Sequence, residues 1–592
     1  MKLTVLALDY DGTITDRDGR LDGSVRAAIR DLRAAGIAVL IVTGRRLEHL
    51  REEIGGLGIV DAVVAENGAL IAFPSSGRTL FLGHPPAEPL LTRLRRAGIP
   101  VVAGQSVIEL EARYAHEALS AIRELELPLV LEFNRERLML LPQSVSKGVG
   151  LREALGALRL SVHNAVAVGN AENDHEMLSV VEIGAAVEWG SEALQRRADE
   201  IVRGDGAPAV AAYIREVASR PRLASTSPHR PPLLLGRDGE GKPVTLRIGG
   251  RNLLVVGDPR SGKSWIAGLL IEQLIIQRYS VCVIDPEGDY QGLETLPGVI
   301  LFGGDDPPPR PRELMQALRN ADFSTVIDLS KCSFDQKREY VLQLLLMLKS
   351  VRRQTGLPHR IVLDEAHYFL DGANVEELLD HELGGYALVT YRLSQLPANI
   401  VGANDVVIVT RHTDRHEVEA LRALRPSSGG EVDWTTALGN QRLEEAVLLP
   451  GADGGPDRPL QFQIAPRITF HVRHQHKYLD VPVSDRHAFL FREDGAVVGK
   501  ARSFRELSEV LAKAKPDVLG NHLRRGDLSR WIHDVFGDRP LAAQVREIER
   551  RYALQPSADV NDELLRLIRD RYSTGGEELA PYSARLQSLM RM

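Results

Sequence analysis

The sequence predicts a multidomain α/β protein, with two sheet-based domains in series followed by a small α+β domain. Length is the first reason, because 592 residues is about three or four times the size of an ordinary domain. Short apolar runs alternate with helix-length amphipathic segments, which is typical of parallel sheets with crossover helices. Proline, serine and basic residues break this pattern at 219–235, after which it starts again. We therefore expect domains at 1–218, 236–465 and 466–592, with a linker at 219–235.

Composition restricts the class of protein before any motif is considered. Hydrophobic residues make up 44% of the chain, yet no apolar stretch approaches the roughly 20 residues that cross a bilayer, so we expect no membrane partner. A net charge of -7 argues against bulk coating of nucleic acid, although a local basic channel stays possible. The two cysteines, Cys282 and Cys332, fit neither a disulfide framework nor a zinc spacing, and the N-terminus lacks signal-peptide features. These features predict a cytoplasmic protein.

The first domain begins with a buried strand that ends in two carboxylates. Apolar runs LTVLAL, IAVLIVT, AVVAEN and NAVAVG predict its strands, and the helix SVRAAIRDLRAAG ends at Gly36. Asp9 and Asp11 follow the first strand at the carboxyl edge of the sheet, where such folds bind ligands. One carboxylate there can attack phosphorus, the other can protonate a leaving group, and the pair favours a divalent cation. The alternative is that these residues form only a polar turn after the strand and have no catalytic role.

Three further segments favour phosphoryl transfer over a simple turn. Thr43 ends the second strand, Lys147 lies in SVSKGVG, and AVAVGNAENDHEML supplies Asn170, Asn173 and Asp174 after another strand. The four segments in this order resemble the haloacid dehalogenase (HAD) superfamily of phosphatases, in the Cof-like group with a cap between the second and third motifs. The resemblance covers about the first 215 residues and implies a Rossmann-like core with a small cap at about 84–142.

The same resemblance assigns roles to these residues. It implies that Asp9 is the nucleophile, Asp11 the general acid and base, Thr43 the phosphoryl-binding hydroxyl, and Lys147 the stabilising cation. It also implies Mg2+ held by Asp9, the Asp11 carbonyl and the loop of Asn170 and Asp174. Asn170 stands where the family usually has aspartate, which predicts weaker metal binding and leaves open a phosphatase reduced to a binding module.

The second domain carries a nucleotide-binding loop in its expected context. The segment NLLVVGDPRSGKS is a strand followed by a glycine-rich loop, and a helix comes next, so loop amides and the helix N-terminus can bind phosphates. Lys263 would reach the β and γ phosphates and Ser264 would bind Mg2+. About 100 residues later, Asp364 and Glu365 end another strand, where Asp364 can hold Mg2+ through water and Glu365 can activate water. The predicted ATP-binding residues are Gly257, Asp258, Pro259, Arg260, Ser261, Gly262, Lys263, Ser264 and Arg411.

With VIDPEGDY, LDEAH and VTYRLSQLPANIVGANDVVIVTRHTD, the second domain resembles the HerA and FtsK branch of ATPases. That resemblance implies a RecA-like fold, a hexameric ring that pumps DNA, and an arginine supplied to the neighbouring subunit, with Arg411 and Arg415 as candidates. Solvated surface arginines are the alternative. Tyr391 stands where the branch usually has a polar sensor, so Thr390 or Gln395 is the substitute expected.

The C-terminal region supplies no mechanism of its own. We expect a hairpin that turns at Asp494 and Gly495, and two amphipathic helices around 528–536 and 541–552, with Trp531 in their core. His471, His474 and His476 predict a polar strand rather than a metal site, and the arginines predict a solvated surface.

Together these patterns predict a Mg2+-dependent bifunctional hydrolase, in which a phosphatase acting on a phosphorylated small molecule is coupled to a ring-forming ATPase. The homo-oligomer expected is a hexamer. The alternative is a DNA-translocating or DNA-sensing ATPase, with the first domain as effector or inactive binding module.

Overall fold

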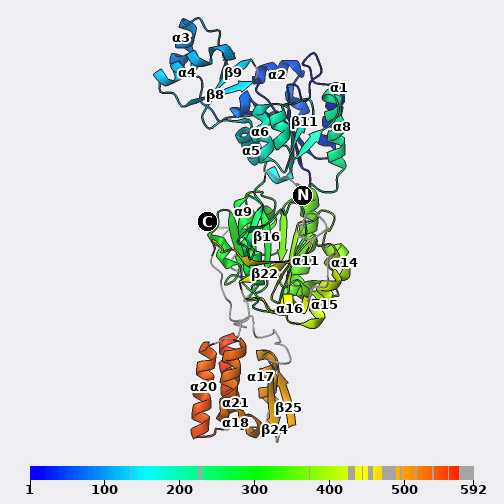
Figure 1. The fold of residues 1–592 in the computed structure, drawn as a ribbon, viewed down its shortest axis with the longest axis vertical. Helices are drawn as coiled ribbons and strands as arrows, with labels where there is room; N and C mark the ends of the chain where they lie inside the picture. Colours follow the sequence, from blue (N-terminus) through cyan, green and yellow to red (C-terminus); the bar gives the residue numbers. More distant parts are fainter. Residues whose placement is uncertain are drawn as a thin grey trace, which may run out of the picture.

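The computed structural model has three bodies that follow one another along the long axis of the molecule (Figure 1). It describes residues 1–134, 136–223, 230–372, 374–424, 434–442, 444–450, 458–469, 488–493, 496–513, 516–536, 539–557 and 559–572. The multidomain α/β class predicted from the sequence is confirmed, because the first two bodies are each built on a large sheet covered by helices.

The first body contains an eight-stranded sheet in the order β12-β11-β10-β1-β2-β3-β4-β5, parallel from β12 to β3. Helices α1 and α8 pack on one face, while α5, α6 and α7 pack on the other. Its strands are β1 (Val5–Asp9), β2 (Ala38–Val42), β3 (Ala62–Ala65), β4 (Leu70–Phe73), β5 (Arg78–Phe81), β10 (Ala165–Gly169), β11 (Ile183–Val187) and β12 (Glu200–Val202). Its helices are α1 (Gly23–Ala34), α2 (Leu47–Glu53), α5 (Lys147–Ala157), α6 (His175–Val180), α7 (Glu192–Arg197) and α8 (Gly206–Ser219), with short helices η1 (Leu57–Ile59), η2 (Glu66–Gly68), η4 (Val162–Asn164) and η5 (Glu172–Asp174).

A small α+β unit is inserted between β5 and α5, over the residues predicted for the cap. Its antiparallel sheet has the order β6-β7-β9-β8, and two helices cover one face of that sheet. The unit comprises α3 (Glu88–Arg96), β6 (Val102–Ala103), β7 (Ile108–Glu111), η3 (Ala112–Tyr114), α4 (Ala115–Glu124), β8 (Leu129–Asn134) and β9 (Arg137–Pro142). It projects to one side of the first body (Figure 1).

The second body contains an eleven-stranded sheet in the order β14-β13-β23-β22-β21-β15-β20-β19-β16-β18-β17. The strands are parallel from β21 to β17 and antiparallel on the β14 side. The strands are β13 (Leu233–Arg237), β14 (Pro243–Leu246), β15 (Leu253–Val256), β16 (Val281–Asp285), β17 (Val299–Gly303), β18 (Ser324–Asp328), β19 (Arg360–Leu363), β20 (Tyr386–Thr390), β21 (Val406–Thr410), β22 (Glu445–Leu448) and β23 (Leu460–Ile464).

Helix α9 (Lys263–Ile276) packs on one face of this sheet, and α11 (Phe334–Thr355) with its neighbours packs on the other. Because α9 is apolar on almost every side, most of its residues are buried in the core. The other helices are α10 (Met315–Leu318), α12 (His367–Leu370), α13 (Val375–Leu378), α14 (Ala398–Gly402), α15 (Arg415–Leu424) and α16 (Trp434–Gly439), with short helices η6 (Gln291–Thr295) and η7 (Leu393–Gln395).

The linker predicted at 219–235 is shorter at both ends in the structure. Helix α8 continues to Ser219, and β13 starts at Leu233, so 233–235 belong to the second sheet. Leu223 is buried, and Arg230 pairs with Glu182 of the first body. The proline-rich composition hid these contacts, because single buried residues leave no periodic pattern.

The first and second bodies share a buried contact. One continuous cluster of buried apolar side chains includes both the α1–α8 face of the first sheet and the α9 face of the second. Beside it, His163 stacks on Tyr279 with ring centroids 3.6 Å apart, and its Nε2 lies 2.9 Å from the Gln277 carbonyl oxygen. The first body therefore rests directly on the residues that follow α9.

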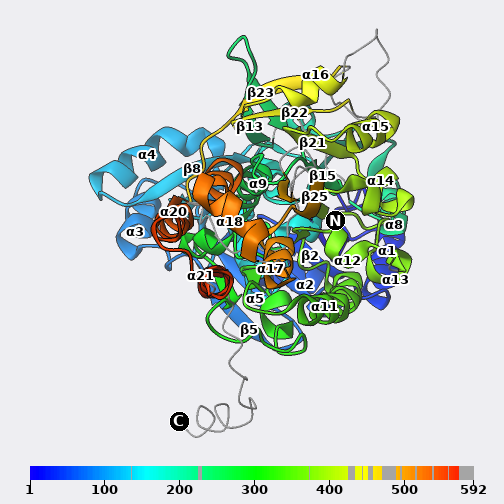
Figure 2. The same ribbon diagram turned by 90° about the horizontal axis from the view of Figure 1, so that it is seen from below.

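The third body joins a hairpin to a group of helices around its own apolar core. It comprises β24 (Phe489–Glu493), β25 (Ala496–Ala501), α17 (Phe504–Lys513), α18 (Pro516–Arg525), α19 (Asp527–Trp531), η10 (Ile532–Phe536), α20 (Arg539–Leu554) and α21 (Val560–Tyr572). Figure 2, a view from below, shows its helices end-on in front of the second body. Trp531 lies in the core, while His471, His474, His476, Asp494 and Gly495 lie outside the described residues. Among the described residues, no helix is long and apolar enough to cross a membrane.

Candidate functional site

The first site forms at the carboxyl edge of the first sheet, around Asp9. Strands β10 and β2 pair in parallel with β1 on either side, so Thr43 and Asn170 emerge at the same edge as Asp9. Asp9 is 3% exposed, and the Thr13 hydroxyl donates to its Oδ2 at 2.9 Å. The parallel register thus brings together three of the residues that the sequence predicted.

Lys147 lies between two buried carboxylates at this edge. It is the first residue of α5, whose N-cap Ser146 accepts from the Val149 backbone N–H. Its Nζ donates to Asp9 Oδ1 at 2.6 Å and to Asp174 Oδ1 at 2.7 Å. Burial and the Asp174 charge raise the pKa of Asp9 to about 7 against the opposing effect of Lys147. The two carboxylates outweigh burial and raise the pKa of Lys147.

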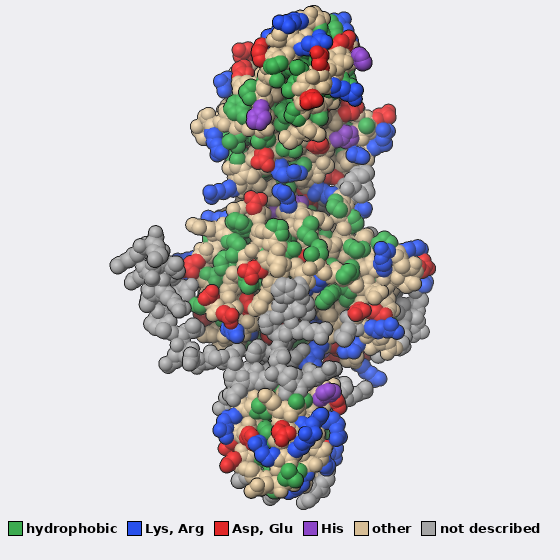
Figure 3. Space-filling model, turned by 90° about the vertical axis from the view of Figure 1, so that its left-hand side faces the viewer, with side chains coloured by type: hydrophobic (Ala, Val, Ile, Leu, Met, Phe, Trp, Pro, Cys, Tyr) green, Lys and Arg blue, Asp and Glu red, His purple; other side chains and the backbone are tan. Residues whose placement is uncertain are grey.

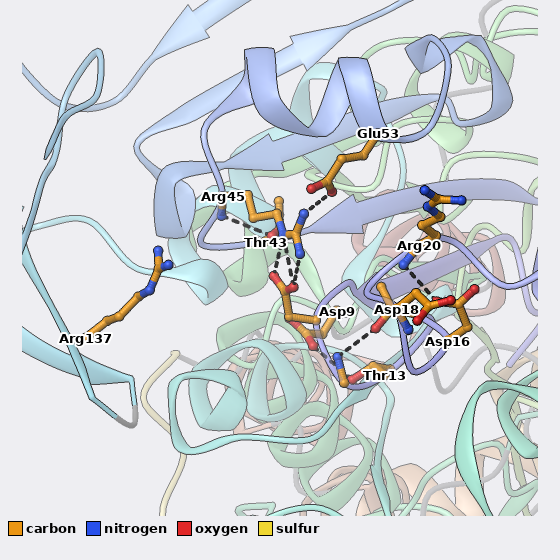
Figure 4. Close-up of polar contacts among 12 residues, drawn as sticks. Asp9, Thr13, Asp16, Asp18, Arg20, Thr43, Arg45, Glu53 and Arg137 are labelled. Atoms are coloured by element: carbon orange, nitrogen blue, oxygen red, sulfur yellow. Dashed lines mark hydrogen bonds and ion pairs between the residues drawn. The ribbon is translucent and has the colours of Figure 1, made fainter. Parts of the chain in front are cut away.

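Asp11 has a partner that the sequence did not reveal. Its carboxylate, half exposed, accepts from the Arg45 guanidinium, with Nη2 and Oδ1 2.5 Å apart. Arg45 also pairs with Glu53 of α2, and its backbone N–H donates to Thr43 Oγ1 at 3.1 Å. Figure 4 shows Arg45 between Glu53 and the strand-end carboxylates, with Arg137 of the inserted unit apart from them. The arginine fixes Asp11 at the open side of the site.

The loop after β10 is held by Asp174. Its Oδ2 accepts from the backbone N–H groups of Asn170 at 2.9 Å and Ala171 at 3.1 Å. Asn173 donates from Nδ2 to Asn67 Oδ1 at 3.4 Å. No group of three His, Cys, Asp or Glu able to hold a metal occurs in the part of the chain that the structure describes. The metal set predicted here contains only two carboxylate side chains near Lys147, plus the Asn170 amide and a backbone carbonyl, all oxygen donors that suit Mg2+.

The nucleotide loop lies between β15 and α9. Gly262 is left-handed (φ 102°), and a Cβ on Gly257 would come within 1.9 Å of Thr410 Oγ1, so both positions require glycine. Lys263 donates to the Asp258 carbonyl oxygen at 3.0 Å, which turns its ammonium back over the loop. Asp258 itself accepts from Thr413 and lies 2.8 Å from His412, whose effects outweigh burial and lower its pKa. The loop residues Pro259 and Ser261 complete the turn predicted from the sequence.

Asp289 is a second residue that sequence patterns missed. The Ser264 hydroxyl donates to Asp289 Oδ2 at 2.7 Å, and Asp289 is buried. It lies in the turn after β16, where Asp285 accepts four successive backbone N–H groups. The DPEGDY segment signalled a turn, but the pairing with Ser264 required the parallel sheet.

Asp364 and Glu365 follow β19, which one strand, β20, separates from β15 in the sheet. Glu365 is left-handed (φ 46°), an uncommon conformation for a residue with a side chain. Buried His367 lies 3.0 Å from Thr390 Oγ1, and burial with the Lys263 charge lowers its pKa to about 3. Tyr391 places its ring 5.7 Å from Lys263 Nζ. Thr390 and Tyr391 thus border the site at the predicted sensor position, whereas Gln395 lies in η7.

The predicted arginines lie at different positions around the loop. The Arg411 carbonyl accepts from the Asp258 backbone N–H at 2.8 Å, directly after β21, and Arg415 begins α15 at the surface. Arg260, left-handed (φ 63°), donates from Nη1 to the Val535 carbonyl oxygen of the third body at 3.1 Å. In the third body, Arg502 pairs with Glu506 and Arg525 with Asp527, so part of the basic surface predicted there is neutralised.

Comparisons with known proteins match both of the bodies that contain these sites. The family model of haloacid dehalogenase-like hydrolases matches residues 6–82 and 105–214. The phosphoglycolate phosphatase of Methanoculleus marisnigri is 32% identical over 200 residues, which is 31% of this chain and 84% of that protein. The chain belongs to the haloacid dehalogenase-like hydrolase family. The phosphoglycolate phosphatase of Aeropyrum pernix is 29% identical over 231 residues, 36% of this chain and 92% of that protein.

The family membership makes the first body a HAD-like hydrolase, and the second body matches another family model. Residues 236–369 match the central domain of helicase HerA. Both resemblances drawn from the sequence are therefore confirmed. A crystal structure of a haloacid dehalogenase-like hydrolase from Bacteroides thetaiotaomicron aligns with 36% of this chain and all of its own, with a TM-score of 0.33 and 18% identity.

Proposed function

We propose that the chain is a Mg2+-dependent phosphomonoesterase that forms an aspartyl phosphate on Asp9 and is coupled to a ring-forming P-loop ATPase. One observation supports the phosphatase activity in this proposal: a single edge of the sheet brings together Asp9, Thr13, Lys147 and Asp174. Phosphoglycolate is the first substrate to test, because two relatives bear that name. The free thiols of Cys282 and Cys332 support a cytoplasmic location.

The side chains at this edge suit a two-step displacement. Asp9 attacks phosphorus, the ester P–O bond breaks, and Asp11 gives its proton to the departing alkoxide. Asp11 then takes a proton from water, whose oxygen attacks the aspartyl phosphate and releases inorganic phosphate and the Asp9 carboxylate. Lys147 offsets charge on the phosphoryl oxygens, and the Thr43 hydroxyl binds one of them.

The oxygen donors at the site fit Mg2+. Asp9, Asp174, the Asn170 amide and the Asp11 carbonyl would hold the ion, and the mutual repulsion of Asp9 and Asp174 is relieved by a cation. When bound, the ion supplies charge neutralisation to the phosphoryl group. In the second body, Ser264 and Asp364 would hold the Mg2+ that accompanies ATP.

The phosphatase proposal is tested by phosphate release from 2-phosphoglycolate, sugar phosphates and nucleotides. Asp9→Asn should abolish ester hydrolysis, by about a thousandfold or more, since no other carboxylate of the site replaces the nucleophile. Lys263→Ala is the matched control and should abolish ATP hydrolysis alone. Ester hydrolysis that survives Asp9→Asn would refute the covalent mechanism, and a chain that cleaves no ester would fit the binding-module alternative.

The ring half of the proposal rests on the ATP-site residues and on an apolar surface. Glu365 would activate the hydrolytic water, and Arg411 or Arg415 would reach the γ phosphate held by a neighbouring copy. Hydrophobic side chains gather on one face of the second body (Figure 3), and Leu234, Trp265, Ile276 and Ile468 are exposed on or beside β13 and α9. Native mass measurement should give a hexamer. A monomer at all concentrations and with ATP would overturn the ring.

A second candidate function is DNA translocation or DNA sensing, with the phosphatase as effector. The match to the helicase HerA central domain favours it. ATP hydrolysis by the full chain should then rise with added duplex DNA, and the rise should weaken with salt. An ATPase rate that DNA leaves unchanged at low salt would exclude this candidate.

A further inference from the structure

One strand of the cap presents a carboxylate to the phosphatase site. In the β8–β9 register, Glu132 stands opposite Met139, so both side chains point to the same side of the cap sheet. The contacts of Met139 show which side of the cap sheet this is. Its sulfur accepts a hydrogen bond from Asn67 Nδ2 at 3.2 Å, and a Cβ on Gly44 would lie 3.6 Å from the same sulfur. Gly44 follows the phosphoryl-binding Thr43. Glu132 therefore faces the catalytic edge, away from α3 and α4.

The surroundings of Glu132 agree with this placement. Its carboxylate lies within electrostatic reach of Lys147, Asp174 and Glu176, and the Asn67 side chain favours its charged form. Burial raises the pKa of Glu132 to about 6, with Glu176 and Asp174 adding to the rise against Lys147. Asn67 also accepts from Asn173, so a chain of polar side chains runs from the catalytic loop to the cap.

Three of the cations that the structure describes around the site are paired with carboxylates. Lys147 is paired with Asp9 and Asp174, and Arg45 is paired with Asp11 and Glu53. The cap cation Arg137 pairs with Glu109. A substrate whose leaving group carries its own negative charge would thus meet Glu132 while these three cations are held by other carboxylates, and like charges placed together cost binding energy.

We propose that Glu132 selects the leaving group, by accepting hydrogen bonds from a neutral polyhydroxyl group and rejecting esters whose leaving group carries a carboxylate. This inference rests on the proposed phosphatase function of the same site. It makes polyol and sugar phosphates the preferred substrate class, and it predicts that phosphoglycolate, the ester named in two relatives, is cleaved less well.

Two esters of the same size separate these substrate classes. 2-Phosphoglycolate carries a carboxylate at the position where 2-hydroxyethyl phosphate carries a hydroxymethyl group. The wild-type chain should favour 2-hydroxyethyl phosphate in kcat/KM by roughly tenfold or more. Glu132→Gln should remove most of that preference, mainly by raising kcat/KM for 2-phosphoglycolate. The matched control is Glu136→Gln, an exposed residue next to Arg137 in the β8–β9 hairpin, which should leave the ratio unchanged.

Binding measurements separate this inference from the proposed function. In an Asp9→Asn background, the dissociation constants of the two esters should show the same preference and the same loss of it with Glu132→Gln. If the wild type cleaves no ester but the binding preference shifts, the phosphatase proposal fails and the role of Glu132 stands. If esters are cleaved and Glu132→Gln leaves their ratio unchanged, or if the wild type prefers 2-phosphoglycolate, the role of Glu132 is overturned.

Discussion

Asp9, Asp174 and Lys147 place two negative charges and one positive charge in a buried site. Burial and then the Asp174 charge raise the pKa of Asp9 above its ordinary value, so ionised Asp9 costs folding free energy. We predict that Asp9→Asn stabilises the metal-free chain at pH 8 by about 1–3 kcal/mol, because the remaining Asp174–Lys147 pair is balanced. Activity is lost while stability is gained, as expected where a site stores unfavourable charge.

Thermal unfolding with a chelator present measures this effect. A raised pKa in the folded state means that the Asp9 penalty is absent below pH 4 and complete above about 7, so the gain should vanish at low pH. Lys147→Met is the control of opposite sign, since it leaves both carboxylates uncompensated and should destabilise the chain. An Asp9→Asn variant that melts below the wild type at pH 8 would contradict the charge argument.

The sequence predicted those residues that follow a strand or begin a helix. Asp9, Thr43, Lys147 and Asp174 belong to short motifs whose positions in the fold follow from the strand pattern, and the structure brings them together. Arg45, Asn67, Asp289 and Glu132 were missed. Their roles depend on partners far away in sequence, such as Asn67 with Met139, and no local pattern encodes such a contact.

Helix α5 approaches the sheet closely through glycines. A Cβ on Gly150 would lie 2.6 Å from Gly68 Cα, whereas a Cβ on Gly156 of the same helix would meet nothing within 4 Å. We predict that Gly150→Ala pushes α5 outward, destabilises the chain by about 1–3 kcal/mol, and lowers kcat because Lys147 begins this helix. Gly156→Ala should instead stabilise by about 0.5–1 kcal/mol through helix propensity.

Chemical denaturation and phosphatase kinetics on the two variants check the helix prediction. Both substitutions add one methyl group to the same helix, so a difference between them reports the close packing and not propensity. Equal stability of the two variants, or an unchanged kcat in Gly150→Ala, would show that α5 tolerates a shift of Lys147.

At the scale of elements, periodic strands and helices were predicted well, and boundaries less so. The alternation of apolar runs and helices gave both parallel sheets, because buried parallel strands are continuous apolar runs. The linker predicted at 219–235 is longer than the one in the structure, because β13 begins at Leu233 and Leu223 is buried. An antiparallel strand of five residues after prolines leaves too short a pattern to detect.

At the scale of the molecule, the two enzymatic bodies share a buried polar network. Glu182 accepts from the Tyr279 hydroxyl at 3.2 Å and from Arg230 at 3.2 Å, and its Oε2 lies 3.1 Å from His163 Nδ1. His359 Nε2 lies 3.0 Å from Asn164 Oδ1. Gln277 follows α9, whose first residue is Lys263, and η4 follows α5, whose first residue is Lys147. Each lysine-bearing helix thus leads to the shared contact, through which the proposed coupling between the two sites would act.

The last prediction concerns this contact. Glu182→Gln removes the nearer of two carboxylates that pair with Arg230, the other being Asp199, so we expect a loss of about 3 kcal/mol in domain docking and two calorimetric transitions in place of one. Exposed Glu124→Gln is the control, with a change within about 0.5 kcal/mol.

Acid should also separate the two bodies, because folding lowers the pKa of two groups at their contact. Although burial opposes it, His163 and Arg230 lower the pKa of Glu182, and burial lowers the pKa of His359. The unfolded chain therefore binds protons more tightly than the folded chain at both groups. The folded contact loses stability below about pH 6.5 through His359 and below about pH 4.5 through Glu182. A wild-type chain that keeps a single transition from pH 8 to pH 4, with Glu182→Gln behaving alike, would show that the apolar cluster alone joins the domains.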